Sequence, residues 1–395
     1  MHQPVVLQNC RLVFPDFIAP GSLRLNRGRI EQVRLDVAAA DGDAEVVDCA
    51  GDFVGPGFVD IHNHGAAGVD FIDGDIEGIE SALAWHQRQG STSVLATLLT
   101  HPPDMIEAAI HRHLEGEKGA EIPANFAGIH IEGPYLNPVK KGMHREDWMH
   151  DPLPAEYQSW VRAGEGRVRI LTAAPERDGS LEMYAWLRSK GIVGSFGHTT
   201  MTWERAQLAA AAGASHFVHV NNAMEWPTRA TNAEGWMQTH ARGIGSFLST
   251  DVFTGEIIGD GWHVTPELVR VLVSAKGLDR IALVSDASPL TGLAPGNYTV
   301  ATVDVELRPG RLCMIADGSG LASSVCSLLD IVRNLVRWGF PLLSAWRMAS
   351  WSPARIAGWS DRGILQVNSR ADLVRLDSQL ALKGVWQGGK PVART

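Results

Sequence analysis

The middle of this chain alternates between short apolar runs and longer amphipathic runs, and this alternation restricts the fold more than any other feature. The short runs predict buried strands, and the runs between them have apolar residues at helical spacing. The predicted strands lie at 58–62, 93–98, 126–131, 168–172, 192–196, 216–220, 256–258 and 281–284. The predicted helices lie at 75–89, 104–114, 181–190, 203–212, 266–275 and 325–338. Eight strand-and-helix units over about 300 residues predict a (β/α)₈ TIM barrel, an α/β fold with parallel strands.

A doubly wound open sheet is the alternative arrangement of the same units. In its dinucleotide-binding form, this fold carries a Gly-x-Gly-x-x-Gly motif directly after the first strand. No such motif follows the predicted strand at 58–62. The barrel is therefore the fold that we expect.

Both ends of the chain differ from the middle, because they hold short β-type segments separated by turn residues. Such segments lie at 11–14 and 29–33 near the N-terminus and at 371–376 near the C-terminus. Neither end is large enough to bury a core by itself. We therefore expect residues 1–55 and 363–395 to form one small β-sandwich domain, with a barrel domain of residues 56–362 inserted between them.

Composition and charge exclude several classes of partner. The formal net charge of −9 disfavours nucleic acid, whose phosphate backbone requires a basic face. No apolar run approaches the roughly 20 residues that span a bilayer, so a membrane partner is not expected. The N-terminus lacks the pattern of a signal peptide, and the four cysteines lack metal-type or redox-type spacing. These features favour a soluble, cytoplasmic enzyme with reduced thiols that acts on a small molecule.

Residues able to bind a metal follow several of the predicted barrel strands. His62 and His64 lie two positions apart on one strand, so their side chains point the same way and could hold one ion. An isolated pair of this kind could equally be two hydrogen-bonded loop histidines. Four further residues of this type follow later strands: Glu132, His198, His219 and Asp286. Because catalytic groups of such barrels lie at the carboxyl ends of the strands, this recurrence predicts a metal site.

The residue types indicate which ion and which chemistry the site would support. Imidazole and carboxylate together suit Zn²⁺ first, and also Fe²⁺, Co²⁺ or Mn²⁺, with one or two ions per subunit. Such an ion promotes hydrolysis by activating water and polarising a carbonyl group. Asp286 is the predicted acid/base that takes a proton from water and passes it to a leaving nitrogen. Asp60 is expected to hold a ring or a turn in place, and His216 is expected to be structural.

Longer motifs run through most of the chain. PGFVDIHNHG occupies 56–65, and further motifs are GIHIEGPYLN at 128–137, KKGMH at 140–144, GHT at 197–199, HVNNAM at 219–224, DGWHV at 260–264 and VSDA at 284–287. The first resembles the opening of the amidohydrolase superfamily. In combination they resemble the N-acetylglucosamine-6-phosphate deacetylase family, and the resemblance implies a metal-dependent deacetylase, expected to be a homodimer.

The resemblance also implies roles for individual residues. Glu132, His198 and His219 match the metal ligands common to the family, and His62 and His64 match the further pair of members with a second metal. Asp286 matches the catalytic acid/base. The matches to substrate contacts are Met143, His144, Asn222, Ala223, Arg229 and His263 around the sugar phosphate, and Leu321, Ala322 and Ser323 near the amide. Arg229 and His263 would supply the cationic donors that a phosphate requires.

The chain departs from the family pattern near the expected phosphate site. The segment at 230–242 is longer than usual and lacks the family's Pro-Gly turn, Trp226 and Trp236 flank the region, and Ser323 stands where glycine is usual. We predict hydrolysis of the acetamide of an N-acetylamino-sugar 6-phosphate, with N-acetyl-D-glucosamine 6-phosphate as the first candidate. N-acetylgalactosamine 6-phosphate, an unphosphorylated N-acetyl sugar, a cyclic amide or another N-acyl amine remain alternatives. A catalytically idle barrel that binds a sugar phosphate is a further alternative.

Overall fold

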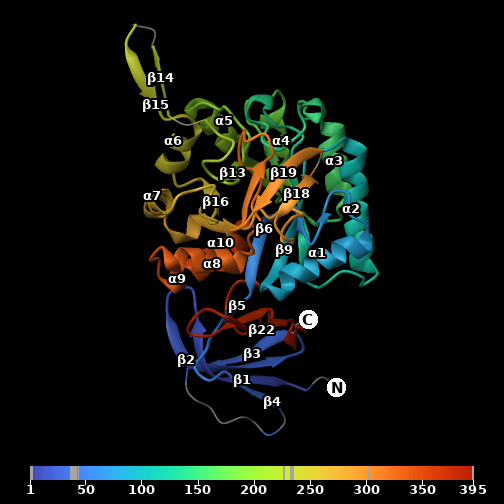
Figure 1. Ribbon diagram of the computed structural model, residues 1–395, viewed down its shortest axis with the longest axis vertical. Helices are drawn as coiled ribbons and strands as arrows, with labels where there is room; N and C mark the ends of the chain where they lie inside the picture. Colours follow the sequence, from blue (N-terminus) through green and yellow to red (C-terminus); the bar gives the residue numbers. More distant parts are fainter. Residues whose placement is uncertain are drawn as a thin grey trace.

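A computed structural model of the protein describes residues 3–35, 42, 44–225, 227–231, 235–300 and 302–393. It consists of a barrel ringed by helices and a β-sheet body that contains both described chain ends (Figure 1). Among the described helices, none has the length and apolar character that crossing a bilayer requires.

Eight parallel strands form the barrel sheet, which confirms the predicted fold class. In sheet order they are β17 (Ile281–Val284), β16 (Thr254–Ile258), β13 (Ala214–Phe217), β12 (Val193–Phe196), β11 (Val168–Ala173), β10 (Phe126–Glu132), β9 (Ser91–Leu98) and β6 (Phe58–Asn63). The sheet nearly closes between β17 and β6, where Asn63 and Ala287 form a parallel bridge. The backbone N–H of Asp286 also donates to the carbonyl oxygen of His62 at 3.0 Å. The closure brings the first and last predicted site segments together.

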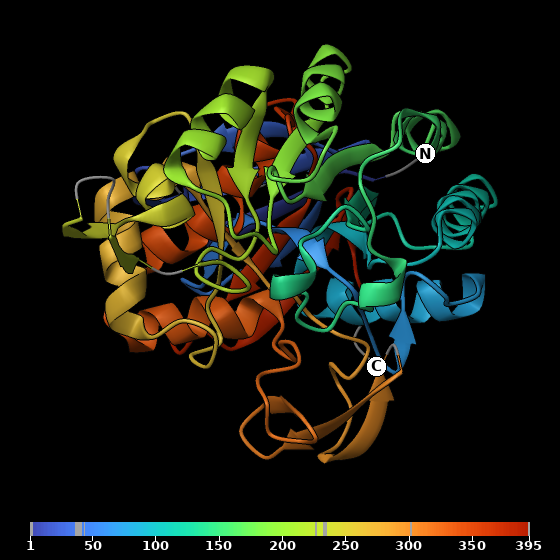
Figure 2. The same ribbon diagram turned by 90° about the horizontal axis from the view of Figure 1, so that it is seen from above.

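The barrel strands are apolar because both of their faces are covered. Every residue of β6, β9 and β10 is buried. One face packs inside the barrel and the other packs against surrounding helices, as Figure 2 shows from above. The helices are α1 (Ile76–Arg88), α2 (Pro103–Lys118), α3 (Pro154–Ala163), α4 (Ser180–Ser189), α5 (Trp203–Ala212), α6 (Arg242–Ser249), α7 (Pro266–Lys276), α8 (Leu328–Arg337), α9 (Leu342–Ala349) and α10 (Trp351–Ile356). Short 3₁₀ helices lie at Pro138–Lys140, Glu146–Trp148 and Leu278–Arg280.

Four of these helices, α3, α6, α9 and α10, were not predicted from the sequence. Three of them are short: α6 and α9 have 8 residues each and α10 has 6. So few turns give little periodic signal, and Pro353 inside α10 is a residue that normally indicates a helix end. The packing of these helices against the barrel outweighs their weak local preference.

The two chain ends share one sheet beneath the barrel. Its strands run in the order β23 (Lys390–Pro391), β22 (Leu382–Gln387), β21 (Leu373–Leu376), β5 (Phe53–Pro56), β1 (Val5–Val13), β2 (Ile18–Asn26) and β3 (Arg29–Arg34), and β4 (Glu45–Asp48) pairs with β1. The antiparallel pairing of β21 with β5 joins the ends directly. This sheet agrees with a small β domain built from both termini, and we keep its limits at residues 55 and 363 as a proposal.

Three smaller β elements leave the barrel on its site-bearing side. Strands β18 (Gly296–Val300), β19 (Val303–Arg308) and β20 (Leu312–Ile315) form an antiparallel insert, drawn in orange beside the barrel in Figure 2. The hairpin of β14 (Thr228–Thr231) and β15 (Met237–His240) projects away from the body at the upper left of Figure 1. A two-residue pair, β7 (Gly65–Ala66) and β8 (Val69–Asp70), follows β6. Trp226 and residues 232–234 lie outside the described residues.

Candidate metal centre

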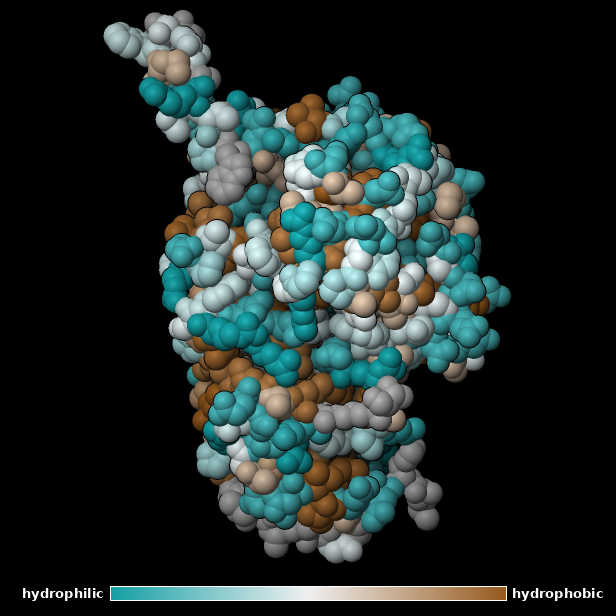
Figure 3. All heavy atoms as spheres, in the orientation of Figure 1, coloured by the Kyte–Doolittle hydropathy of each residue, from teal (hydrophilic) through white to brown (hydrophobic). Residues whose placement is uncertain are grey.

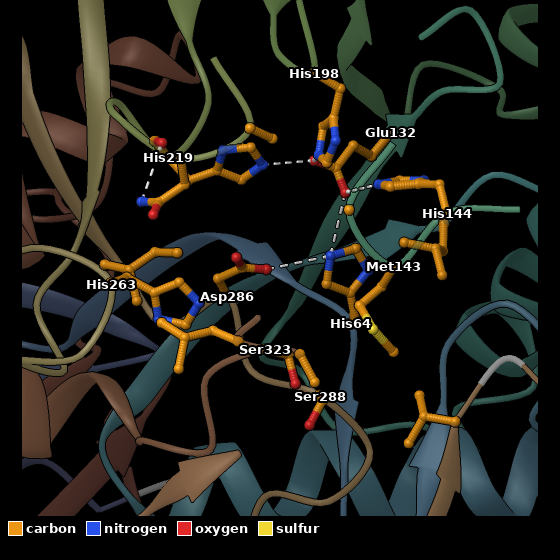
Figure 4. A pocket seen from close by; sticks show the side chains of 18 of the residues that line it. His64, Glu132, Met143, His144, His198, His219, His263, Asp286, Ser288 and Ser323 are labelled. Carbon is orange, nitrogen blue, oxygen red and sulfur yellow. Dashed lines mark hydrogen bonds and ion pairs between the residues drawn. The ribbon is translucent and has the colours of Figure 1, made fainter. Parts of the chain in front are cut away.

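Glu132, the last residue of β10, lies between two pairs of histidines. Its Oε2 atom is 3.4 Å from Nε2 of His62 and 3.3 Å from Nε2 of His64. Its Oε1 atom is 3.4 Å from Nε2 of His198 and 3.0 Å from Nε2 of His219. Figure 4 shows Glu132 with His64, His198 and His219 around it. One carboxylate therefore offers a separate oxygen to each histidine pair.

Asp286, two residues beyond the end of β17, completes the cluster around the first pair. Its Oδ1 atom is 3.3 Å from Nε2 of His64 and 3.6 Å from Nε2 of His62. His144 approaches from the other side, with Nε2 at 3.5 Å from Oε2 of Glu132. The residues predicted from six separate parts of the sequence thus meet at the carboxyl ends of the barrel strands.

Three of these residues have positive φ angles, which residues other than glycine rarely adopt. The φ angles are +48° at His198, +26° at His219 and +44° at Asp286. Each follows a barrel strand and begins the loop after it. Such strain concentrates at functional sites, where the surrounding structure holds it in place. Here the turn at each strand end directs the side chain into the barrel mouth.

Three of the rings that face Glu132, those of His62, His144 and His198, are oriented by a hydrogen bond to their other nitrogen. Nδ1 of His62 lies 2.8 Å from Oε2 of Glu256, and Nδ1 of His198 lies 2.7 Å from the carbonyl oxygen of Lys140. Nδ1 of His144 lies 2.7 Å from the hydroxyl of Thr100. Metal-binding histidines are commonly held in this way, which leaves Nε2 directed at the ion.

The cluster requires positive charge. Burial alone would raise the pKa of Glu132, but the nearby His62 and the hydrogen bonds from His144, His198 and His219 hold it well below its ordinary value. Burial would lower the pKa of His64, yet its contacts with Asp286 and Glu132 raise it to about 9. Ionised carboxylates surrounded by ring nitrogens are stable only with added protons or a cation.

The donor set fits a metal ion. Among the described residues, ligand atoms lie within 4.8 Å of one another in four overlapping groups: His62, His64 and Glu132; His62, His219 and Asp286; Glu132, His144 and His198; and, deeper in the barrel, His62, His130 and Glu256. Nδ1 of His64 and Nδ1 of His219 are buried without a hydrogen-bond partner, so the protein itself does not satisfy all of its ring nitrogens. Mixed imidazole and carboxylate ligands bind Zn²⁺ and several other divalent first-row metals.

A pocket of about 310 Å³ opens next to this cluster. Of the metal-site residues, His62 does not line it, because its side chain is fully buried behind the others. The predicted contacts that do line the pocket are Met143, His144, Asn222, Ala223, His263, Leu321, Ala322 and Ser323. Figure 4 shows Met143, His263 and Ser323 around the opening. The site predicted for a sugar is thus continuous with the site predicted for a metal.

Arg229 is the one predicted substrate contact that does not line the described pocket. It lies on β14 of the projecting hairpin, is exposed, and is not among the residues that line the pocket. The structure therefore does not bring Arg229 to the pocket of its own chain. The physical reason is that β14 pairs with β15 in a hairpin that leads away from the barrel (Figure 1).

His263 lines the pocket and is paired with a buried carboxylate. Its Nδ1 atom lies 2.7 Å from Oδ2 of Asp260, and Oδ1 of Asp260 accepts hydrogen bonds from the backbone of Trp262 and His263. Burial would lower the pKa of His263, but Asp260 raises it above the ordinary value, with a smaller contribution from Asp286. A pocket-lining imidazole whose pKa is raised holds its proton more readily, which suits a substrate that carries a negative group.

Sequence reasoning missed some residues near the centre. Glu256 is fully buried behind the histidines, and a charged residue inside the apolar strand β16 was a signal that could have indicated it. Asp70, Ser288 and Val300 line the pocket but lie in segments without a motif.

Asp60, by contrast, was expected to hold a ring or a turn in place. It accepts hydrogen bonds from the backbone and hydroxyl of Ser285, so it holds the turn before Asp286.

The chain is similar to known deacetylases along most of its length. The model of the Amidohydrolase family matches residues 53–393. The chain is 32% identical over 372 residues to the N-acetylgalactosamine-6-phosphate deacetylase of Escherichia coli O157:H7, covering 93% of each protein. It is 30% identical over 339 residues to the N-acetylglucosamine-6-phosphate deacetylase of Vibrio furnissii, covering 85% of this chain and 82% of the relative.

The chain is also similar to a solved deacetylase structure along its whole length. It is a mutant of N-acetyl-D-glucosamine-6-phosphate deacetylase from Mycobacterium smegmatis in complex with N-acetyl-D-glucosamine-6-phosphate. The TM-score is 0.89 at 30% sequence identity, and the match covers 100% of both chains. The chain therefore belongs to the amidohydrolase family and, within it, to the N-acetylglucosamine-6-phosphate deacetylase family.

Proposed function

We propose that this protein is a metal-dependent deacetylase that hydrolyses the acetamide of N-acetyl-D-glucosamine 6-phosphate to the free amine and acetate. The observation that carries the proposal is the position of Glu132 between two histidine pairs, beside Asp286 and at the edge of a sugar-sized pocket. The named activities of the relatives and the mixed ligand set support the same conclusion.

Glu132, His198 and His219 are the proposed ligands of one divalent ion, and His62 and His64 are those of a second. Zn²⁺ is the first choice, and Fe²⁺, Co²⁺ and Mn²⁺ suit the same ligands. An ion held by these ligands would lower the pKa of water, so that hydroxide is available as the nucleophile near neutral pH, and would polarise the carbonyl under attack. The protein's own contribution is to hold the ligands and to move the protons.

Asp286 is the proposed acid/base. It accepts a proton from water as the acetamide carbonyl is attacked, and then donates that proton to the departing amine. Its pKa is held below the ordinary carboxyl value because His62 and His64 outweigh the opposing effect of burial, so it is ionised and ready to accept. His144, which lines the pocket, is the proposed group that steadies the carbonyl oxygen as negative charge develops on it.

The phosphate end of the substrate is proposed to meet His263 and Asn222, which both line the pocket. An assay of acetate release from a panel of N-acetylated sugars in defined metals tests this assignment. We expect N-acetylglucosamine 6-phosphate to be hydrolysed fastest and its unphosphorylated form at least about tenfold more slowly, because loss of a charged contact worth 1.5–3 kcal/mol changes kcat/KM by that factor or more. Equal rates for both forms would contradict the phosphate assignment.

N-acetylgalactosamine 6-phosphate is the second candidate substrate. The relative from Escherichia coli O157:H7, which is 32% identical to this chain, has this activity by name. The same panel separates the two epimers through their kcat/KM values. Binding of either sugar phosphate without acetate release would instead support an idle, sugar-binding barrel.

The proposal includes a homodimer and a cytoplasmic location. The four cysteines are buried and free, which agrees with a reducing compartment. The hairpin stands clear of the rest of the surface (Figure 3), and Trp236 and Met237 on it are 73% and 54% exposed. Large exposed apolar side chains at one place indicate a protein contact.

Sedimentation equilibrium is expected to give twice the mass of the 42.8 kDa chain. Replacing Trp236 and Met237 with serine should shift the protein towards the monomer, because it removes apolar area from the expected contact. A wild-type protein that sediments as a monomer at all concentrations would contradict the dimer.

A further inference from the structure

Glu256 occupies an unusual place for a charged side chain. It lies in the middle of β16, where the other residues at 255–258 are buried and apolar or glycine, and its own exposure is 0%. It does not line the pocket. Burying a lone carboxylate costs free energy unless several donors compensate it. The hydrogen-bond partners of Glu256 therefore indicate its role.

Three donors surround the Glu256 carboxylate. Oε2 accepts from Nδ1 of His62 at 2.8 Å and from the backbone N–H of His219 at 3.1 Å. Oε1 accepts from Nε2 of His216 at 3.1 Å. Two of the three donors belong to proposed metal ligands, and these ligands come from the two different histidine pairs around Glu132.

We propose that Glu256 is a positioning residue of the metal centre, which fixes the ring of His62 and the backbone of His219 together and so sets the spacing of the two histidine pairs. The inference rests on the metal centre of the proposed function and assigns to it a residue that does not touch the ion. His216 belongs to the same network, because its other nitrogen lies 2.8 Å from the hydroxyl of Thr254.

The hydrogen bonds determine which nitrogen of His62 can bind a metal. Oε2 of Glu256 accepts from the backbone N–H of His219 and lies 2.8 Å from Nδ1 of His62, and a carboxylate held by N–H donors on both oxygens acts only as an acceptor. Nδ1 of His62 must then carry the proton. In a neutral ring this leaves a lone pair on Nε2, the atom that lies 3.4 Å from Glu132 and 3.6 Å from Asp286.

The bond to His219 acts on the backbone rather than the ring. His219 has a φ angle of +26°, which is strained for a residue with a side chain. A charge-assisted hydrogen bond to its N–H stabilises that turn. This backbone turn places Nε2 of His219 at 3.0 Å from Oε1 of Glu132. A carboxylate needed only for packing would have no reason to contact both ligands.

Glu256→Gln tests the inference through metal affinity, without any sugar present. Metal-free protein is titrated with Co²⁺, and binding is followed by visible absorption. We expect affinity to fall by about 10- to 100-fold, the usual effect of losing an outer partner of a ligand. Asp372→Asn is the matched control, because Asp372 is another buried carboxylate with short hydrogen bonds but lies in the β domain. Its Co²⁺ affinity should match that of the wild type.

Two further variants distinguish positioning from simple stabilisation. In a His62→Asn background, Glu256→Gln should weaken Co²⁺ binding less than in the wild type, because only its bond to the backbone of His219 is left to lose. Glu256→Asp keeps the charge, and should bind Co²⁺ with intermediate affinity even if the Gln variant does not fold. Wild-type Co²⁺ affinity in folded Glu256→Gln or in Glu256→Asp, or equal effects in both backgrounds, would overturn the inference. A protein that binds Co²⁺ but releases no acetate would contradict the proposed function alone.

Discussion

Asp286→Asn is expected to lower kcat for acetate release by about 10²- to 10⁴-fold, the range that general acid–base catalysis supplies. Asparagine keeps the size of the side chain and its ability to contact His62 and His64, which lie 3.6 and 3.3 Å from Oδ1. It cannot accept the proton of the attacking water. The variant should therefore stay folded and keep its metal. Turnover is measured as acetate release, and metal content by elemental analysis.

Asp70→Asn is a matched control for this experiment. Asp70 also lines the pocket, but it forms no ion pair with the described histidines, lysines or arginines. Its loss should change kcat far less than the loss of Asp286. If Asp286→Asn turned over at the wild-type rate, or if both variants lost the same activity, the acid/base role would belong to another group.

Glu132→Gln is expected to weaken metal binding by at least about 100-fold, and acetate release should fall with it. Losing an outer partner of a ligand already costs about 10- to 100-fold, and Glu132 is itself the residue that faces both histidine pairs. The amide nitrogen of glutamine would present a donor where one pair now meets an oxygen. Metal content after dialysis and kcat at saturating metal are the measurements.

The comparison for Glu132 is Glu176→Gln. Glu176 lies at the same end of the barrel and accepts hydrogen bonds from Asn137, Thr199 and Thr200, but it is in no group of clustered metal ligands among the described residues. The Glu176→Gln protein should retain most of its metal. A Glu132→Gln protein that kept its full metal content would show that the ion lies elsewhere.

The barrel could be predicted because its signal repeats. The strands are buried on both faces, so they appear as short apolar runs, and each predicted metal-site residue lies at or just beyond the end of such a run. Once the strands are parallel and closed, their carboxyl ends must lie together. Residues as distant as His62 and Asp286 therefore met as expected.

Other features could not be predicted because their signal is not local. The charge of Glu256 inside an apolar strand is visible in the sequence, but its partners are not, because His216 and His219 lie 40 and 37 residues away and meet it only when β16 lies beside β13. The position of Arg229 depends on a hairpin whose direction no motif determines. The short helices α9 and α10 form because they pack beneath the barrel.

Anomalous X-ray diffraction from crystals of the metal-loaded protein, recorded at the absorption edge of the bound ion, tests the central claim most directly. We predict a peak within bonding distance of Glu132 and of at least one histidine pair, His198 with His219 or His62 with His64. An active, metal-containing crystal with no peak near Glu132 would contradict the account.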